Sequence, residues 1–241
     1  MTTYKMNFDF TDNTERQVLI ELQEQGFVLL GYKGARGPSQ IPVGAPTWLT
    51  VPFGNIFSVA DIQYTPRYRL YATNQSNIAV GTVIEMRSQS NELNLGGAMT
   101  FNPDGTFVSG GVGSVPSDSI GLYNSRPAGT PPLTVGLASE VATPSGRSFL
   151  PFCAFTLNPQ NSIIMTPLEN ILLVAARMNL SSGNVQASVA APGCNFSFNN
   201  QVTSYDLLVQ PSSFALTNRS GTAPVSSVPS GSVISQIVNK S

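Results

Sequence analysis

The chain of 241 residues contains no histidine, and this absence removes a large group of possible active sites. Histidine is the side chain that most often transfers protons near neutral pH, so every Ser-His or Cys-His arrangement is excluded. Two cysteines without a histidine also leave no usual tetrahedral zinc site. We therefore expect a protein that is not an enzyme and that uses no metal ion or other cofactor.

Charged residues are scarce as well, at 10% of the chain against the ~25% that is usual for soluble domains. With 12 basic and 13 acidic residues the formal net charge is -1, so no long-range field would attract nucleic acid, and none is expected as a partner. Few charges also mean little repulsion between copies, which predicts self-association into a homo-oligomer. The surface must consist mainly of uncharged polar residues.

Long apolar runs are missing too. The richest stretch, residues 163–176, is interrupted by Pro167 and Glu169, whereas a membrane-spanning helix needs about 18 apolar residues. Residues 1–10 lack the apolar run of a signal peptide. These features predict a soluble, cytoplasmic protein.

Cys153 and Cys194 are the two cysteines. In a reducing compartment they are expected to be buried thiols. The alternative is one disulfide, which would contribute roughly 4 kcal/mol through chain entropy.

Turn signals dominate the remaining pattern, because 21 glycines and 18 prolines separate short β-branched and aromatic runs. This spacing predicts an all-β protein. The sharpest signal is residues 102–105 (NPDG), which predicts a hairpin between a strand ending at Phe101 and one starting at Thr106. Residues 158–161 (NPQN) predict a similar turn, with Asn161 in the place of Gly105.

Residues 14–25 (TERQVLIELQEQ) fit two patterns. They contain good helix formers after a possible cap at Asp12 or Asn13. The same residues alternate between polar and apolar, and the apolar cluster continues beyond Gly26. We interpret the region as two strands joined near Gly26, with a helix as the alternative.

The two halves of the chain resemble each other weakly. Thr65-Pro66 is followed by Leu70, Gly81 and Val83, and Thr166-Pro167 is followed by Ile171, Gly183 and Val185. A single one-residue insertion aligns these positions. The repeat predicts two tandem antiparallel β-sandwich units, residues 1–112 and residues 115–211, separated by the Gly/Ser-rich residues 109–114. Residues 212–241 are expected to form a Gly/Ser/Pro-rich tail, loosely ordered to about residue 230.

Residues 64–71 (YTPRYRLY) are the best candidate for a recognition surface. Strand alternation places Tyr64, Tyr68 and Leu70 on one face, and Arg67, Arg69 and Tyr71 on the other. One interpretation is a strand with a core face and a solvated face. The other is a sugar or protein contact in which Tyr71 stacks and the two arginines donate hydrogen bonds.

Several segments between residues 40 and 190 follow a pattern that can be compared with a known family. They are Trp48 just before a strand, residues 64–81 (YTPRYRLYATNQSNIAVG), the 101–107 hairpin, residues 119–123 (SIGLY) and residues 155–183. This pattern resembles the rhizosphere-induced protein (RhiA-like) family of bacteria and fungi, although Leu168 and Ile171 replace expected aromatics. The resemblance implies a cytosolic β-rich protein without established catalytic residues, so no site is carried over. Independently of it, Trp48 is expected in the core.

These features favour a binding or self-assembling protein, lectin-like, defence-type or structural, with a carbohydrate, lipid or protein as ligand. Two alternatives stay open. A membrane-active toxin would use Ser/Thr-rich strands within residues 179–189. A carboxylate-dependent hydrolase would need two of the scattered acidic residues to meet, for instance Glu85 and Glu140.

Overall fold

The computed structural model describes residues 2–240, which form two eight-stranded sheets. The first sheet has the order β11 (Gly146–Pro151), β10 (Leu133–Thr143), β5 (Val59–Thr73), β1 (Tyr4–Asp9), β16 (Ser204–Val209) and β17 (Leu216–Asn218). In addition, β12 (Phe155–Leu157) pairs with β10, and β6 (Ser88–Gln89) pairs with β5.

The second sheet has the order β18 (Ser226–Val228), β15 (Gly193–Ser197), β13 (Ser162–Ala176), β9 (Ile120–Asn124), β7 (Ala98–Phe101) and β8 (Phe107–Ser109). In this sheet β2 (Val28–Arg36) pairs with both β13 and β4 (Leu49–Pro52). A small sheet joins β3 (Ala45–Pro46) to β14 (Val185–Gln186). Pairing is antiparallel except between β1 and β16 and between β7 and β9.

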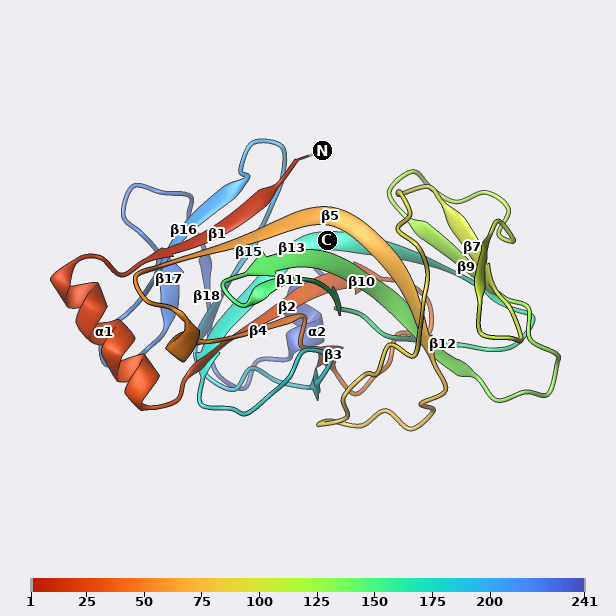
Figure 1. Cartoon of the computed structure of the whole chain (residues 1–241), viewed down its shortest axis with the longest axis horizontal. Helices are drawn as coiled ribbons and strands as arrows, with labels where there is room; N and C mark the ends of the chain where they lie inside the picture. The colour runs from red at the N-terminus through yellow and green to blue at the C-terminus, as the bar shows by residue number, and fades with distance from the viewer. Residues whose placement is uncertain (1, 241) are drawn as a thin grey trace.

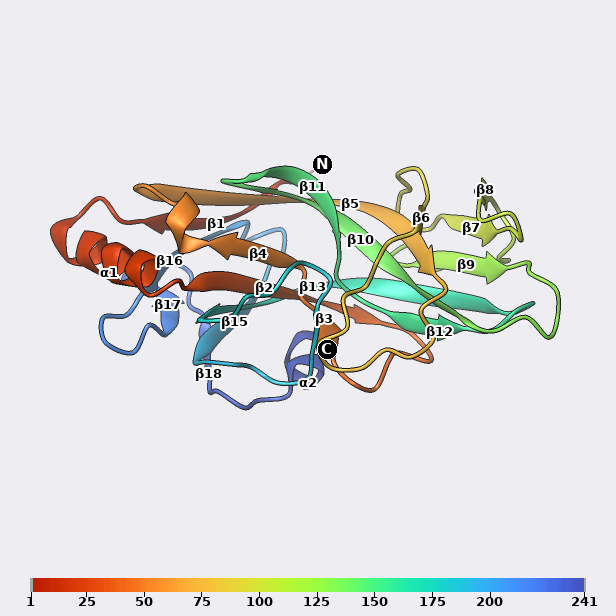
Figure 2. The ribbon, with the colours of Figure 1, turned by 60° about the horizontal axis from the view of Figure 1, so that its bottom comes forward.

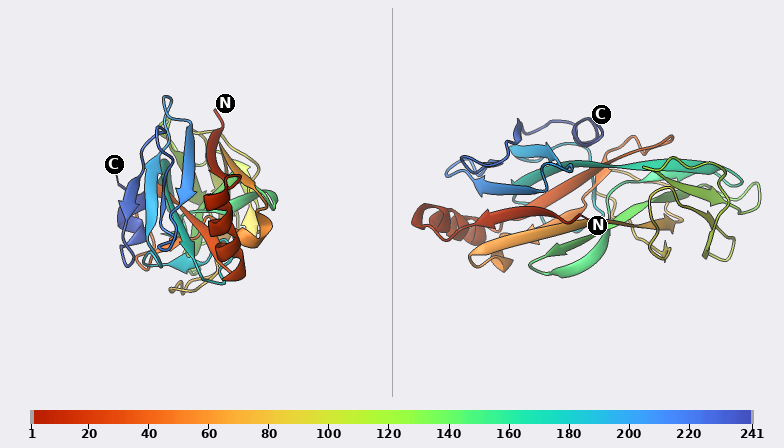
Figure 3. Two further views of the ribbon diagram at one scale, coloured as in Figure 1. Left: turned by 90° about the vertical axis from the view of Figure 1, so that its left-hand side faces the viewer. Right: turned by 90° about the horizontal axis from the view of Figure 1, so that it is seen from above.

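The molecule is elongated, and the long strands β5 and β13 run through its middle (Figure 1). Helix α1 (Asn13–Glu24) lies at one end and strands β7 and β9 lie at the other (Figure 2). The inner faces of the two sheets share one apolar core, which includes Phe8, Trp48 and Phe155, and the two layers are visible from above (Figure 3). This confirms the predicted all-β class, the two-unit sandwich and the core position of Trp48.

The two units of the sandwich are the sheets, and each sheet draws strands from both predicted sequence ranges. β5 pairs along its length with β10, and β2 pairs with β13. Residues 109–114, expected as a boundary, connect β8 to β9 within one sheet. Strands from the ranges 1–112 and 115–211 are therefore interleaved within each sheet, because two strands that pair need not be close in sequence.

The internal repeat has a clear structural counterpart. Thr65-Pro66 lies in β5, and the pairing of β5 with β10 shifts register just after Thr65. Thr166-Pro167 lies in β13, and the pairing with β2 shifts register just after Pro167. Because proline cannot donate to a strand ladder, it favours such a bulge. Equivalent bulges therefore bend the central strand of each sheet.

The glycine turns of the two repeats contact each other directly. The amide of Gly81 donates to the carbonyl oxygen of Val185 at 2.8 Å, and the amide of Ile84 donates to that of Gly183 at 2.9 Å. The two glycine turns are thus side by side in space, with the bonds offset from the aligned positions.

Residues 13–24 form a helix, so the two-strand interpretation of this region is wrong. Asp12 caps the helix by accepting hydrogen bonds from the amides of Thr14 and Glu15. The buried side chains are Val18, Leu19 and Leu22, which lie on one face of a helix. The cap and this spacing outweigh the polar-apolar alternation. The chain turns at Gly26, where φ is +67°, before β2.

The predicted 101–107 hairpin is confirmed. Gly105 has a φ of +86°, and Asp104 Oδ1 accepts from the amide of Thr106 at 3.0 Å. The second turn differs from its prediction, because β12 belongs to the first sheet and β13 to the second. It carries the chain between sheets, and its positive φ of +58° falls at Gln160 rather than Asn161.

The C-terminal segment is not the loosely ordered tail that its composition predicted. β17 extends the first sheet, β18 extends the second, and helix α2 (Ile234–Val238) packs on β2 and β13. Ile234 and Val238 are buried in this contact. The two apolar side chains lie one helical turn apart and cover the outer face of the second sheet, which fixes the segment.

Both cysteines are buried free thiols, as expected. Within residues 2–240, no helix has the length and apolar character that crossing a membrane requires.

Candidate functional site

The structure separates the three residues predicted to form a recognition surface. Tyr71 does share the outer face of β5 with Arg67 and Arg69, but it is fully buried. Its hydroxyl donates a 2.6 Å hydrogen bond to the carbonyl oxygen of Cys153. Ile84 packs over it in a small apolar cluster. Tyr71 therefore cannot stack on a ligand, because the segment after β5 folds back over this part of the sheet.

Arg67 and Arg69 remain accessible, and each faces carboxylates. Arg67 lies 3.9 Å from both Glu92 and Glu140, and Arg69 lies 3.8 Å from Glu92. The guanidinium of Arg69 also lies 4.1 Å from the centre of the Phe149 ring. The pairs with Glu92 are exposed and contribute little to stability, whereas the Glu140 side chain is 11% exposed. We interpret the surface as a solvated ladder of ion pairs.

The inner face of β5 takes part in a polar network that sequence reasoning did not foresee. Glu169 Oε1 accepts from Tyr64 at 3.1 Å and from Tyr68 at 3.0 Å, and Glu169 Oε2 lies 3.0 Å from Lys33 Nζ. Lys33 also donates to the carbonyl oxygen of Leu168. Burial of Tyr64 and Tyr68 was predicted by strand alternation, but their polar partners come from other strands.

Burial governs the electrostatics of this network. Burial lowers the pKa of Lys33, while the nearby Glu169 carboxylate opposes that shift. Burial also raises the pKa of Tyr64 and of Tyr68 well above the usual value. The Lys33 side chain is fully shielded from solvent. The network therefore joins the two sheets and does not present a charge to a ligand.

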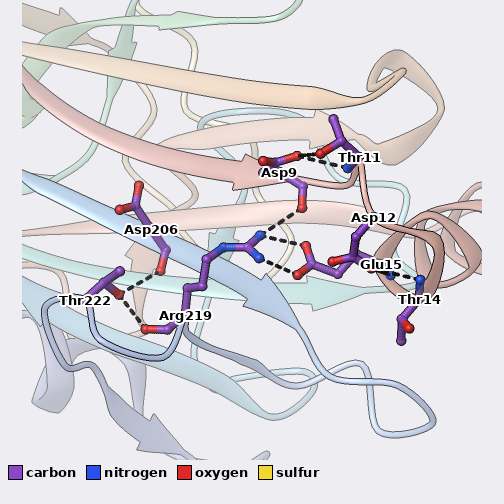
Figure 4. A network of polar contacts seen from close by, with 8 residues as sticks. All are labelled: Asp9, Thr11, Asp12, Thr14, Glu15, Asp206, Arg219 and Thr222. Atoms are coloured by element: carbon purple, nitrogen blue, oxygen red, sulfur yellow. Dashed lines mark hydrogen bonds and ion pairs between the residues drawn. The ribbon is translucent and has the colours of Figure 1, made fainter.

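A second network closes the end of the molecule near α1 (Figure 4). Arg219 binds both carboxylate oxygens of Glu15 and donates to the carbonyl oxygen of Asp9 at 2.9 Å. Hydrogen bonds from Thr11 lower the pKa of Asp9. This arrangement ties the C-terminal segment to the N-terminal helix, so its acidic groups are satisfied internally.

Two adjoining cavities form the best candidate for a ligand site. They lie at the end of the molecule opposite α1, have volumes of about 260 and 360 Å³, and share Asn74 and Arg126. We call them together the Asn74–Arg126 groove. Its residues are Ala72, Thr73, Asn74, Ser76, Arg87, Ser88, Phe101, Pro103, Asp104, Gly105, Arg126, Pro131, Pro132 and Leu133.

Arg126 is held rigidly at the point where the two cavities join. Its Nε and its backbone amide each lie 3.3 Å from Oδ1 of the buried Asn124, and its Nη2 donates to the carbonyl oxygen of Pro131. Gln160 in turn donates to the carbonyl oxygen of Arg126. Within residues 2–240 no carboxylate lies within ion-pair distance of Arg126.

The same cavity also carries a carboxylate fixed by hydrogen bonds. Asp104 Oδ1 accepts from both the amide and the hydroxyl of Thr106, at 3.0 and 2.7 Å, which lowers the pKa of Asp104. The other carboxylate oxygen of Asp104, Oδ2, takes part in neither bond. Arg87 lines the same cavity and pairs with Glu85 at 3.1 Å. The groove thus offers a guanidinium, a carboxylate and an amide.

The carboxylates proposed for hydrolysis have separate partners. Glu85 pairs with Arg87, whereas Glu140 pairs with Arg67 and Arg147. Neither glutamate lines the groove. Within residues 2–240 no cluster of three or more possible metal ligands is found. Residues 179–189, proposed for membrane insertion, contain the two-residue strand β14.

Comparisons of the chain with models of protein families, with curated proteins and with solved structures give no match.

Proposed function

We propose that the protein acts by binding carbohydrate in the Asn74–Arg126 groove, without catalysing a reaction. The observation that carries this proposal is the combination of a fixed guanidinium and a fixed carboxylate at one concave site. Sugar hydroxyls both donate and accept hydrogen bonds, so they suit walls that offer both kinds of group.

The size of the groove agrees with a small ligand. Pockets for small molecules commonly have volumes of about 300–1,000 Å³, and the two cavities have about 260 and 360 Å³. The site therefore suits one or two sugar rings, with Asn74 and Arg126 contacting both.

Preorganisation supports binding as the purpose of this geometry. Arg126 and Asp104 are both held by hydrogen bonds within the chain. Side chains that are already ordered lose less conformational entropy when a ligand binds. A weak, shallow site can therefore still discriminate between ligands by the positions of their polar groups.

The test is binding to a glycan array, followed by titration calorimetry on each hit. Asn74→Trp would fill the junction of the two cavities and should abolish binding. Asn77→Trp places the same side chain at an exposed position three residues away, outside the groove, and should leave binding intact. If the wild-type protein binds no glycan, the proposal is wrong.

Self-assembly is the second candidate function. The net charge is -1 and charged residues make up 10% of the chain, so little charge is available to keep copies apart. Sedimentation velocity at rising protein concentration tests it, and a strictly monomeric species would exclude it. Membership of the rhizosphere-induced protein family is likewise a proposal, supported by the sequence pattern.

A further inference from the structure

We infer that the sugar bound in the Asn74–Arg126 groove carries a carboxylate, as a uronic acid does, and that Arg126 recognises it. This inference rests on the proposed carbohydrate-binding function and adds the chemical class of the ligand. It starts from the surroundings of one arginine.

Arg126 differs from the other arginines of intermediate exposure. Arg69, Arg126 and Arg219 are the arginines of this kind within residues 2–240. Arg69 pairs with Glu92, and Arg219 pairs with Glu15. Arg126 instead contacts neutral oxygens, those of Asn124 and Pro131. Its positive charge is the one in this group that no carboxylate of the described chain compensates.

The bonds that Arg126 already makes leave one side of its guanidinium for a ligand. Nε and one hydrogen of Nη2 are used within the chain. Nη1 and the second hydrogen of Nη2 remain, and they form the fork that binds a carboxylate with two parallel hydrogen bonds. Because Arg126 lines both cavities, a ligand in either one lies beside this residue.

Asp104 restricts the charge that the ligand can carry. Its carboxylate lines the cavity that also contains Arg126, and its lowered pKa keeps it ionised at neutral pH. A phosphate, with up to two negative charges, would be repelled by it more strongly than a carboxylate. A sugar hydroxyl, in contrast, can donate to the second oxygen of Asp104. One carboxylate together with hydroxyls therefore fits the site best.

The experiment uses matched sugars that differ in the group at C6 and thus in charge. The array carries sugars of gluco, galacto and manno configuration. Each is present as the hexose, the hexose 6-phosphate, the uronic acid and the methyl ester of the uronic acid. We expect the protein to bind at least one uronic acid about tenfold more tightly than its methyl ester, which corresponds to about 1.4 kcal/mol. The phosphate should bind more weakly than the acid.

Variants at Arg126 then test whether this residue causes the preference for the acid over its ester. Arg126→Gln should lower the affinity for the acid to that for the ester, while the affinity for the ester changes less than about twofold. Arg126→Lys keeps the charge but loses the fork and should give an intermediate preference. Arg16→Gln, at an exposed position on α1, is the matched control and should keep the full preference. Thermal unfolding of each variant verifies its fold.

The outcomes distinguish a failure of the carboxylate inference from a failure of the proposed carbohydrate binding. Equal binding of the acid and its ester, or equal losses for both in Arg126→Gln, overturns the carboxylate inference but leaves carbohydrate binding standing. Tighter binding of the phosphate overturns it too. If a correctly folded protein binds none of the sugars, the proposed function fails together with the inference.

Discussion

The hydroxyl of Tyr68 donates a 3.0 Å hydrogen bond to Oε1 of Glu169, which links β5 of the first sheet to β13 of the second. The two residues occupy equivalent positions of the internal repeat, each three residues after the threonine of a Thr-Pro pair. The bulges that follow Thr65 and Thr166 therefore bring corresponding positions of the two sheets together. One copy supplies an aromatic hydroxyl there, and the other supplies the carboxylate that accepts from it.

Glu169→Gln should destabilise the protein by about 3 kcal/mol, because it leaves the Lys33 ammonium buried without its counter-charge. Urea unfolding at pH 7 measures this loss. The double variant Lys33→Met with Glu169→Leu should recover a large part of it, since no buried charge is then left unpaired. Glu85→Gln breaks an exposed pair and should cost less than about 1 kcal/mol. A Glu169→Gln loss as small as this control would contradict the prediction.

The buried thiols should make the protein less stable in alkali. Burial raises the pKa of Cys153 and that of Cys194 from 9.0 to about 12. Between these values the unfolded thiol loses its proton while the folded one keeps it, so stability is full below pH 9 and falls as the pH rises towards 12. From pH 8 to pH 10 each thiol should contribute a loss on the order of 1 kcal/mol.

Cys194→Ala isolates this effect. In urea unfolding with a reductant present, the variant should lose on the order of 1 kcal/mol less than the wild type between pH 8 and pH 10. Lys33 has a lowered pKa and so gains stability with pH until its unfolded form titrates. That contribution is common to both proteins and cancels in the comparison. The same pH dependence in both would refute the role of Cys194.

Local signals in the sequence were sufficient where neighbouring residues decide the structure. The NPDG turn fixes its hairpin through Asp104 and Gly105, which need no distant partner. The alternation of residues 64–71 correctly predicted that Tyr64 and Tyr68 face the core. The alignment of Thr65 with Thr166 was also sound, since both precede equivalent bulges.

Predictions failed where a distant segment decides the outcome. Tyr71 lies on the expected face of its strand but is covered by residues including Ile84. The C-terminal residues look loosely ordered by composition, yet Ile234 and Val238 become buried on a sheet formed much earlier in the chain. The interleaving of the two halves depends likewise on which strands meet, and periodicity within a strand carries no information on its partner.

The candidate site could not be predicted for the same reason. Its residues come from separate parts of the chain: Asn74 follows β5, Asp104 lies in the hairpin, and Arg126 follows β9. The property that marks Arg126, a partly buried charge without a carboxylate beside it, is defined by three-dimensional surroundings.

Gly34→Ala should disrupt the packing of α2. A Cβ atom at Gly34 would lie 2.0 Å from the carbonyl oxygen of Val238, so the helix would have to move. We expect a loss of at least about 2 kcal/mol and faster proteolysis within residues 229–240. Gly54→Ala is the matched control, because a Cβ atom there meets nothing within 4 Å. If α2 is equally protected from protease in both variants, the helix does not depend on this contact.

The ion pair between Arg219 and Glu15 should stabilise the protein more than an exposed pair does. The side chains of Arg219 and Glu15 are 33% and 14% exposed, whereas those of Arg87 and Glu85 are 64% and 58% exposed. The contact is also bidentate (Figure 4), and the hydrogen bond that Arg219 donates to Glu15 raises the pKa of Arg219. We expect a coupling energy of about 1–2 kcal/mol for Arg219 and Glu15, against about 0.5 kcal/mol or less for Arg87 and Glu85.

Two double-mutant cycles measured by urea unfolding test this difference. One uses Arg219→Met and Glu15→Gln, and the other uses Arg87→Met and Glu85→Gln. Added salt screens exposed charges more effectively than partly buried ones, so 1 M NaCl should remove most of the second coupling and leave much of the first. Hydrogen exchange should also show faster opening of α1 in Arg219→Met, because this residue joins the helix to the C-terminal segment. Equal coupling energies in the two cycles would mean that the bidentate geometry adds nothing to the stability of this end of the molecule.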